Sequence, residues 1–255
     1  MTNLLLIVGA SYCPEARALF RNMGVQPSVP LAKAYDDYFN GLRAAGILSV
    51  ADEIYYLRAH TAQASLLNLM NPAQTMTASV GAGTLTFTPY QGWDTDGAAS
   101  YLLGPANITT LAHFSQDNGS IWAKPNSNVQ SGNDAGSVSS TNQAVNARNA
   151  SDQFVTRGNS ATTTTVASIT EARALCGWDR NNSANYVQYR GGVSVGTPAA
   201  VSAALPAARF SIGRGGSSFS AKRQGAGGIG GSMTAAQWAA LNTLNAAFDA
   251  VVATL

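Results

Sequence analysis

The chain shows two hydrophobic periods, and the clearer one is the helical period at its C-terminus. Hydrophobic residues recur there every three or four positions, at Trp238, Leu241, Leu244, Phe248, Val251 and Leu255. This spacing predicts an amphipathic helix over residues 234–254. Thr234 and Gln237 predict a capping box at its start, because each side chain can bond the other residue's backbone N–H. Six apolar side chains, each contributing about 1.5–3 kcal/mol when buried, require a partner, either the sheet of the same domain or another subunit.

Upstream of this helix the hydrophobic period is two, which is typical of strands. Residues 186–190 and 193–195 alternate on either side of Gly191 and Gly192, and this pattern predicts a β-hairpin. The same alternation predicts strands at residues 85–88, 100–103, 109–114, 120–123, 154–156 and 210–213. Asn118 followed by Gly119 is a further hairpin signal.

The segments between these strands are rich in turn-forming residues. We interpret residues 92–97 and 177–182 as turns, and the glycine-rich segment between residues 213 and 231 as a loop. Residues 168–170 fit either a strand or a helix start. Residues 124–165 are dominated by Asn, Ser, Thr and Gly, but apolar residues recur at strand spacing, so we expect short strands there.

The chain before residue 76 follows a helical pattern. A helix is predicted where apolar residues recur at helical spacing before a C-cap glycine, at Leu31, Tyr35, Tyr38, Phe39, Leu42 and Gly46. Pro14 predicts the start of a short helix, and further helical pieces are expected at residues 50–58 and 61–70. The apolar run over residues 3–8 is short for a signal peptide and lacks its basic residues. We expect it to be a strand that is buried or that pairs with a partner.

Composition limits the classes of partner. Charged residues make up only 11% of the chain and the net charge is +2, against roughly 25% charged residues in ordinary domains. This leaves no basic surface for nucleic acid and no polybasic membrane patch. No stretch is long enough to span a bilayer, so neither nucleic-acid binding nor membrane insertion is expected.

The two cysteines, Cys13 and Cys176, are far apart and have no metal-ligand spacing. We expect buried free thiols, and a bridge between them stays open. Cys13 before Pro14 superficially resembles the redox motif of glutaredoxins, in which a helix N-terminus lowers the pKa of a thiol. The second cysteine of that motif is missing, so a structural role is favoured.

No catalytic or metal-binding set is predicted. Asp94, Asp96 and Gly97 match part of a calcium loop, but the further ligands and the closing Glu are absent, so a turn is favoured. His60 and His113 have no recognisable nucleophile elbow nearby. Adjacent acids on a helix point in different directions, so Asp36 and Asp37 are assigned to a solvated face. The other acids considered show no pairing in the sequence: Asp117, Asp134, Asp152 and Asp179.

Several segments together carry a family resemblance. They are residues 34–47, 51–57, 66–72, 87–102, 210–213 and 229–237. In this order they are similar to the laminin-G-like, concanavalin-type jelly-roll proteins of tailed bacteriophages and prophages. The resemblance covers residues 30–255 and implies a virion protein that is assembled in the host cytoplasm. It transfers no binding residue.

The fold expected from the pattern and the resemblance is mainly β. It is an antiparallel jelly-roll β-sandwich with an N-terminal helical segment and one C-terminal amphipathic helix. We divide the chain into an attachment segment over residues 1–30, a helical segment over residues 31–75 and the sandwich over residues 76–255. The N-terminal segment is expected to contact other virion proteins, and a homo-oligomer is expected.

Three functions follow from these expectations. The first is a non-enzymatic virion protein of fibre, spike or decoration type that recognises a host-surface polysaccharide. Aromatic side chains are the usual platforms for sugars, and Trp93, Trp122, Trp178 and several tyrosines are candidates, although each also fits a core position. The second is an architectural head-decoration or tail-associated subunit without a ligand. The third, a glycan-degrading enzyme, needs paired carboxylates across a cleft and is least favoured. No cofactor is expected.

Overall fold

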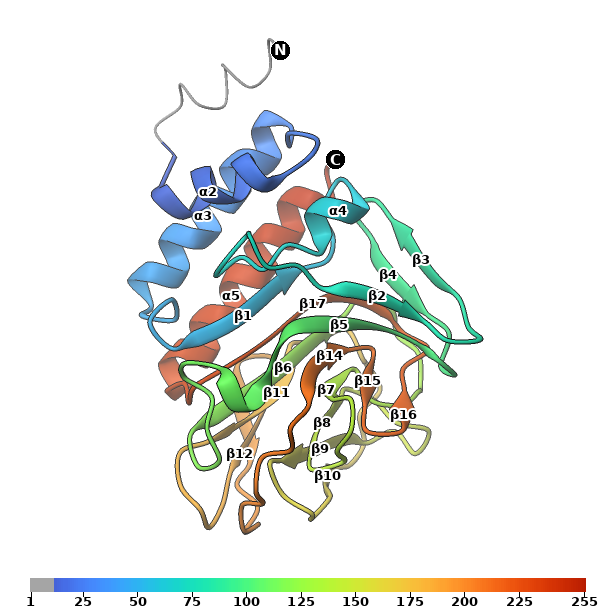
Figure 1. The fold of residues 1–255 in the computed structure, drawn as a ribbon. Coiled ribbons are helices and arrows are strands. Elements are labelled where there is room, and N and C mark those ends of the chain that lie inside the picture. The colour runs from blue at the N-terminus through green and yellow to red at the C-terminus, as the bar shows by residue number, and fades with distance from the viewer. Residues whose placement is uncertain (1–11) are drawn as a thin grey trace.

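The computed structural model describes residues 12–255 and consists of two antiparallel β-sheets with a layer of helices on one side. In Figure 1 the helices lie at the upper left and strands β7–β10 lie at the bottom. The expected mainly-β antiparallel sandwich with helices at both ends of the chain is confirmed.

The first sheet has eight strands. In spatial order they are β13 (Val193–Gly196), β12 (Val187–Arg190), β11 (Cys176–Arg180), β6 (Gly119–Pro125), β17 (Arg223–Gly230), β4 (Gly92–Thr95) and β3 (Leu85–Thr88). The eighth strand, β1 (Ala51–Tyr56), pairs with the second half of β17, beyond the two residues of β17 that pair with β4. The long strand β17 is therefore the centre of this sheet.

The second sheet has seven strands. In spatial order they are β10 (Thr164–Val166), β9 (Phe154–Gly158), β8 (Gln143–Asn146), β7 (Ala135–Ser137), β14 (Arg209–Ile212), β5 (Ser100–Asn107) and β2 (Thr77–Val80). A separate small hairpin is formed by β15 (Arg214–Gly215) and β16 (Ser218–Phe219).

Two hydrophobic cores separate the three layers. Between the two sheets lie Trp178, Phe210 and Ile121. Helices α2 (Pro14–Asn22), α3 (Val29–Ala44) and α5 (Ala235–Val252) bury a second core against the outer face of the first sheet. Two shorter helical turns are α4 (Ala62–Ser65) and η1 (Ile108–Thr110).

The long helices confirm the predictions made from hydrophobic spacing. Helix α2 starts at Pro14, and Gly46 follows α3 with a φ of 70°. Both hydrogen bonds of the capping box at Thr234 are present in α5. The buried stripe of α5 is rotated slightly from the predicted one, because Asn245 and Val252 are buried while Leu255 is exposed. The strand predicted within residues 3–8 lies outside the described residues.

The helix predicted at residues 50–58 is wrong, because this segment forms strand β1. Ile54 and Tyr56 face the helices, and Tyr55 faces the second sheet. A strand buried on both faces has a continuous apolar run, which periodicity does not distinguish from a buried helix. The helix predicted at residues 61–70 is reduced to the single turn of α4.

Three segments assigned to turns or loops are strands. Residues 92–95 form β4, residues 176–180 form β11, and much of the glycine-rich segment forms β17. Glycine is required in these strands by close packing. A Cβ on Gly228 would lie 2.7 Å from the Trp122 ring, and one on Gly177 would lie 2.5 Å from the Trp238 ring.

The strand predicted at residues 109–114 is also wrong. This segment is η1 followed by a loop, and the Asp52 carboxylate accepts the N–H groups of Ala112, His113 and Phe114 at 2.9–3.2 Å. Those donors are consequently not available to a sheet. The turn before Gly119 leads into β6 without a preceding strand, and residues 168–170 form neither helix nor strand. The other predicted strands are confirmed.

Candidate functional site

The three tryptophans considered as sugar platforms belong to the core. Trp93, Trp122 and Trp178 are 7%, 3% and 0% exposed. The Trp93 indole N–H donates to the Ser65 hydroxyl at 2.9 Å, and Trp178 packs edge-on against Phe114 and Tyr186. None of the three therefore presents a ring face to a ligand.

The acidic residues singled out from the sequence are held in local interactions. Asp94 forms a bidentate ion pair with Arg223, whose Nε and Nη2 lie 2.8 and 2.9 Å from the two carboxylate oxygens. Asp96 accepts the N–H groups of Ala98 and Ala99, and these hydrogen bonds lower the pKa of its carboxyl strongly. Within residues 12–255 no group of three His, Cys, Asp or Glu side chains is arranged to hold a metal.

Asp179 and Asp152 also have partners within the protein, one buried and one on the surface. Asp179 accepts from the Met233 N–H and the Trp238 indole N–H at 2.6 and 3.1 Å, and so fixes the start of α5 against β11. Burial raises the pKa of its carboxyl. Asp152 pairs with Arg148 at 2.6 Å on the surface.

The adjacent acids Asp36 and Asp37 have different surroundings. Asp36 is buried and accepts the Cys13 N–H at 2.6 Å, so its assignment to a solvated face is wrong. Asp37 is exposed and pairs with Lys33. Cys13 and Cys176 are both free thiols, which excludes the bridge that the sequence left open. Burial raises the pKa of the Cys176 thiol to about 12.

An aromatic and cationic cluster lies instead on the outer face of the second sheet. We call Tyr101, Arg214 and Phe219 the platform. The guanidinium carbon of Arg214 lies 4.8 Å from the Tyr101 ring centre and 4.9 Å from the Phe219 ring centre. The two rings are 6.1 Å apart. All three side chains are partly exposed.

Alternation along β5 and the small hairpin explain why these side chains meet. Leu102 points into the core between the sheets, so Tyr101 points outward. Arg214 and Phe219 are directly opposite each other on β15 and β16. Gly213 and Gly216 have φ values of 86° and 61°, a region that glycine adopts without strain. These glycines allow the chain to leave β14 and turn back across the sheet.

A buried ion pair fixes both ends of this hairpin. The Asp134 backbone carbonyl accepts the Gly213 N–H at 2.7 Å, and its carboxylate accepts the Ser220 hydroxyl at 2.7 Å. Lys222 lies 3.2 Å from the same carboxylate, and both side chains of the pair are 0% exposed. Removing one partner of a buried pair destabilises by about 3–5 kcal/mol, so the hairpin is firmly held in place.

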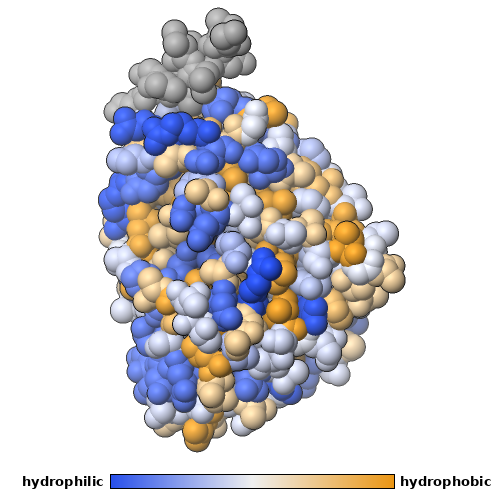
Figure 2. Space-filling view, in the orientation of Figure 1, coloured by the Kyte–Doolittle hydropathy of each residue, from blue (hydrophilic) through white to orange (hydrophobic). Residues whose placement is uncertain are grey.

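Two hydroxyl-bearing residues of β2 lie on the same face as the platform. Ser79 lies directly opposite Tyr101 on β2, and Thr77 lies opposite Leu103. The Arg214 Nε–H donates to the Gly216 carbonyl at 2.7 Å. Within the described chain its two terminal nitrogens have neither a hydrogen bond nor an ion pair. Figure 2 shows the molecule in the orientation of Figure 1, with hydrophilic, pale and hydrophobic residues mixed over this view.

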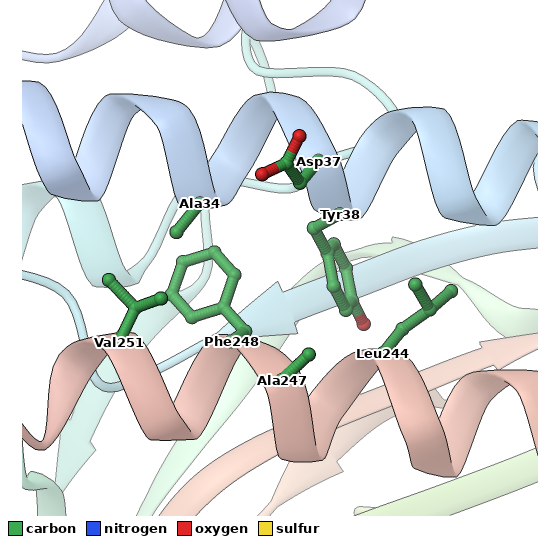
Figure 3. A pocket seen from close by; sticks show the side chains of 7 residues that line it. All are labelled: Ala34, Asp37, Tyr38, Leu244, Ala247, Phe248 and Val251. Atoms are coloured by element: carbon green, nitrogen blue, oxygen red, sulfur yellow. The ribbon is translucent and has the colours of Figure 1, made fainter.

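A hollow lies between α3 and α5 and has a volume of about 130 Å³. Figure 3 shows its walls, which are Ala34, Asp37, Tyr38, Leu244, Ala247, Phe248 and Val251. Its one carboxylate belongs to Asp37, which is already paired with Lys33. The Tyr38 hydroxyl accepts a hydrogen bond from the Asn245 side chain at 3.2 Å. Both polar side chains of the hollow therefore already interact within the protein, and the platform is the better candidate site.

Comparisons with known proteins bear on the fold. No family model and no curated protein matches the chain. A Trypanosoma rangeli sialidase in complex with a difluorinated sugar acid is similar to 83% of this chain, with a TM-score of 0.53 and 10% identity. The receptor binding domain of a botulinum neurotoxin C/D mosaic serotype is similar to 77% of it, with a TM-score of 0.51 and 8% identity.

These similarities define a shared β-sandwich fold. The chain spans 38% of the sialidase and 51% of the neurotoxin domain, so each of those proteins has a large part with no counterpart here. None of the described helices is long and apolar enough to cross a membrane.

The sequence interpretation missed the platform. Tyr101 was placed in a strand, but Arg214 and Phe219 fell in the segment assigned to a loop. The alternation of Ser100, Tyr101 and Leu102 was the one local signal, since it places the tyrosine on the face opposite to Leu102.

Proposed function

We propose that this chain is a non-enzymatic virion protein of fibre, spike or decoration type that binds a host-surface glycan through the platform. The observation that carries the proposal is the cluster of Tyr101, Arg214 and Phe219 on an open, Ser- and Thr-lined sheet face. Aromatic rings with one polar neighbour suit a sugar, because a sugar ring has an apolar C–H face and a polar rim. The phage assignment rests on the sequence resemblance.

The test of the site is binding to an array of defined neutral, carboxylated and sulfated oligosaccharides. We expect saturable binding of at least one glycan by the unaltered protein. Tyr101→Ala should weaken that binding about tenfold or more, which corresponds to at least about 1.4 kcal/mol. Tyr12→Ala is the matched control, because Tyr12 is also partly exposed but packs on Phe20 beside α2. Absence of any glycan binding, or equal losses in both variants, would contradict the proposal.

The virion assignment is tested separately by immunogold labelling of purified phage particles. Label at a distal tip, with saturable binding of the protein to host cells, is the expected result. Label on the shell or tail wall without cell binding would replace the recognition function with an architectural one. Particles without any label would remove the virion assignment altogether.

A further inference from the structure

Arg214 combines two properties that restrict the position of its guanidinium. Its guanidinium lies within 5 Å of two aromatic ring centres, and its Nε–H is held by the Gly216 carbonyl at 2.7 Å. Stacking and one fixed hydrogen bond limit the rotation of the group. Little conformational entropy is then left to lose when a ligand binds.

The terminal nitrogens of this fixed guanidinium are available to a ligand. No carboxylate within residues 12–255 forms an ion pair with Arg214. The buried acid that holds the hairpin, Asp134, is paired with Lys222. Arg157, on β9 of the same sheet, differs from Arg214 because one of its terminal nitrogens already has a partner. Its Nη1 donates to the Thr141 carbonyl at 3.3 Å, and its Nε–H donates to the Thr163 hydroxyl at 2.6 Å.

We propose that the platform selects glycans that carry a carboxylate, with the carboxylate held by the two terminal nitrogens of Arg214. This inference rests on the proposed function and specifies its ligand class. A planar carboxylate accepts two parallel N–H bonds from guanidinium, whereas a neutral hydroxymethyl group does not. The sugar ring then packs on the exposed parts of Tyr101 and Phe219, and the hydroxyls of Thr77 and Ser79 lie opposite Leu103 and Tyr101 along the same face.

The experiment compares one uronic-acid oligosaccharide with its methyl ester, which has the same sugar rings but no charge. Titration calorimetry of the full chain should give at least about tenfold tighter binding of the acid, as expected for a charge-assisted pair. In Arg214→Gln the affinities for the acid and the ester should be about equal, and the affinity for the ester should stay within about twofold of that of the unaltered protein. Arg157→Gln removes the same charge from the same sheet and should keep the preference.

Arg214→Lys separates charge from geometry. Lysine keeps the positive charge but lacks the planar pair of donors, so its preference for the acid should lie between those of the unaltered protein and Arg214→Gln. Circular dichroism and the midpoint of thermal unfolding confirm that each variant is folded. If Arg214→Gln does not fold, the result for Arg214→Lys decides the question.

Three outcomes would overturn the inference, and they are distinguishable from one another. Equal affinities for acid and ester in the unaltered protein would remove carboxylate selection while glycan binding by the platform stands. Tighter binding of a sulfated analogue than of the carboxylated one would replace the ligand class. Absence of binding to any oligosaccharide by a folded protein would remove the proposed function, and this inference with it.

Discussion

The outer faces of the two sheets have opposite surroundings. The first sheet is covered by α2, α3 and α5, and rings from helix and strand interlock there, with Phe248 lying 3.9 Å from Tyr56 and 4.8 Å from Tyr35 between ring centres. The outer face of the second sheet carries the small β15–β16 hairpin, which places Phe219 beside Arg214, and no helix of residues 12–255 packs there. One face therefore uses aromatic residues for stability, and the other presents them to solvent.

Charged side chains on the two outer faces differ in whether they have partners. On the covered face, Asp249 of α5 pairs with Arg58 at 2.6 Å and also with Lys124, and it accepts a hydrogen bond from Tyr56. Every charge in this group has a partner. On the open face the terminal nitrogens of Arg214 have none within the described chain. This contrast places the stabilising contacts on the helical side, and it agrees with a proposed recognition site on the open side.

The largest expected effect comes from truncating an aromatic residue on the covered face. Phe248 is 2% exposed and contacts rings from α3 and β1. Phe248→Ala should lower the free energy of unfolding by about 3–5 kcal/mol, through lost burial and the cavity left behind. Urea unfolding measures the change, with Ala247→Ser as the control, because Ala247 is exposed on the same helix. A loss below about 1 kcal/mol would show that α5 contributes little to the fold.

The same contrast explains which elements the sequence could predict. Helix α5 was predictable because its signals are local: a capping box within four residues and a regular apolar stripe. Strand β11 was not predictable, because Asp179 and Arg180 are residue types typical of a turn. They are buried in this strand because residues distant in sequence satisfy their polar groups. The Asp179 carboxylate is satisfied at Met233 and Trp238, and Arg180 by the Gly158 and Ala200 carbonyls.

The candidate site was harder to predict than the fold. The β15–β16 hairpin brings Arg214 next to Tyr101, and the position of this hairpin depends on the buried pair of Asp134 and Lys222. Neither hydrophobic period nor turn chemistry carries information on a contact between residues so far apart. The tryptophans, which are the usual sugar platforms, were instead needed to fill the cores. Aromatic residue type alone therefore did not distinguish Tyr101 from the buried rings.

A carboxyl group of the first sheet is buried between the two sheets. Glu53 of β1 is 1% exposed, accepts a hydrogen bond from Tyr55 at 2.9 Å, and lies close to Gly104 of β5. Burial raises the pKa of its carboxyl to about 7 from the ordinary 4.5. The folded protein then binds more protons than the unfolded chain between these values. The contribution of Glu53 to stability is complete below about pH 4.5 and is lost as the pH rises to about 7.

Glu53→Gln tests this pH dependence, because glutamine keeps the acceptor for Tyr55 and does not ionise. The gap between the two pKa values corresponds to roughly 3 kcal/mol. The variant should therefore gain up to that amount relative to the unaltered protein between pH 4.5 and pH 8. Urea unfolding at both pH values measures the gain. Asp37→Asn, at an exposed carboxylate on α3, should show no comparable trend. A difference between Glu53→Gln and the unaltered protein that stays constant with pH would contradict the prediction.

The smallest expected effect on stability lies on the open face. Phe219 is partly exposed, and its main partners are Arg214 and Tyr101. Phe219→Ala should cost about 1 kcal/mol of unfolding free energy, since an exposed cation–π contact contributes about 0.5–1 kcal/mol. The same variant should lose most of its glycan affinity, because Arg214 loses one of the two rings that hold it. Urea unfolding and glycan titration on one preparation separate the two effects. A stability loss as large as that of Phe248→Ala, with affinity retained, would mean that the hairpin closes the sandwich rather than presenting a ligand site.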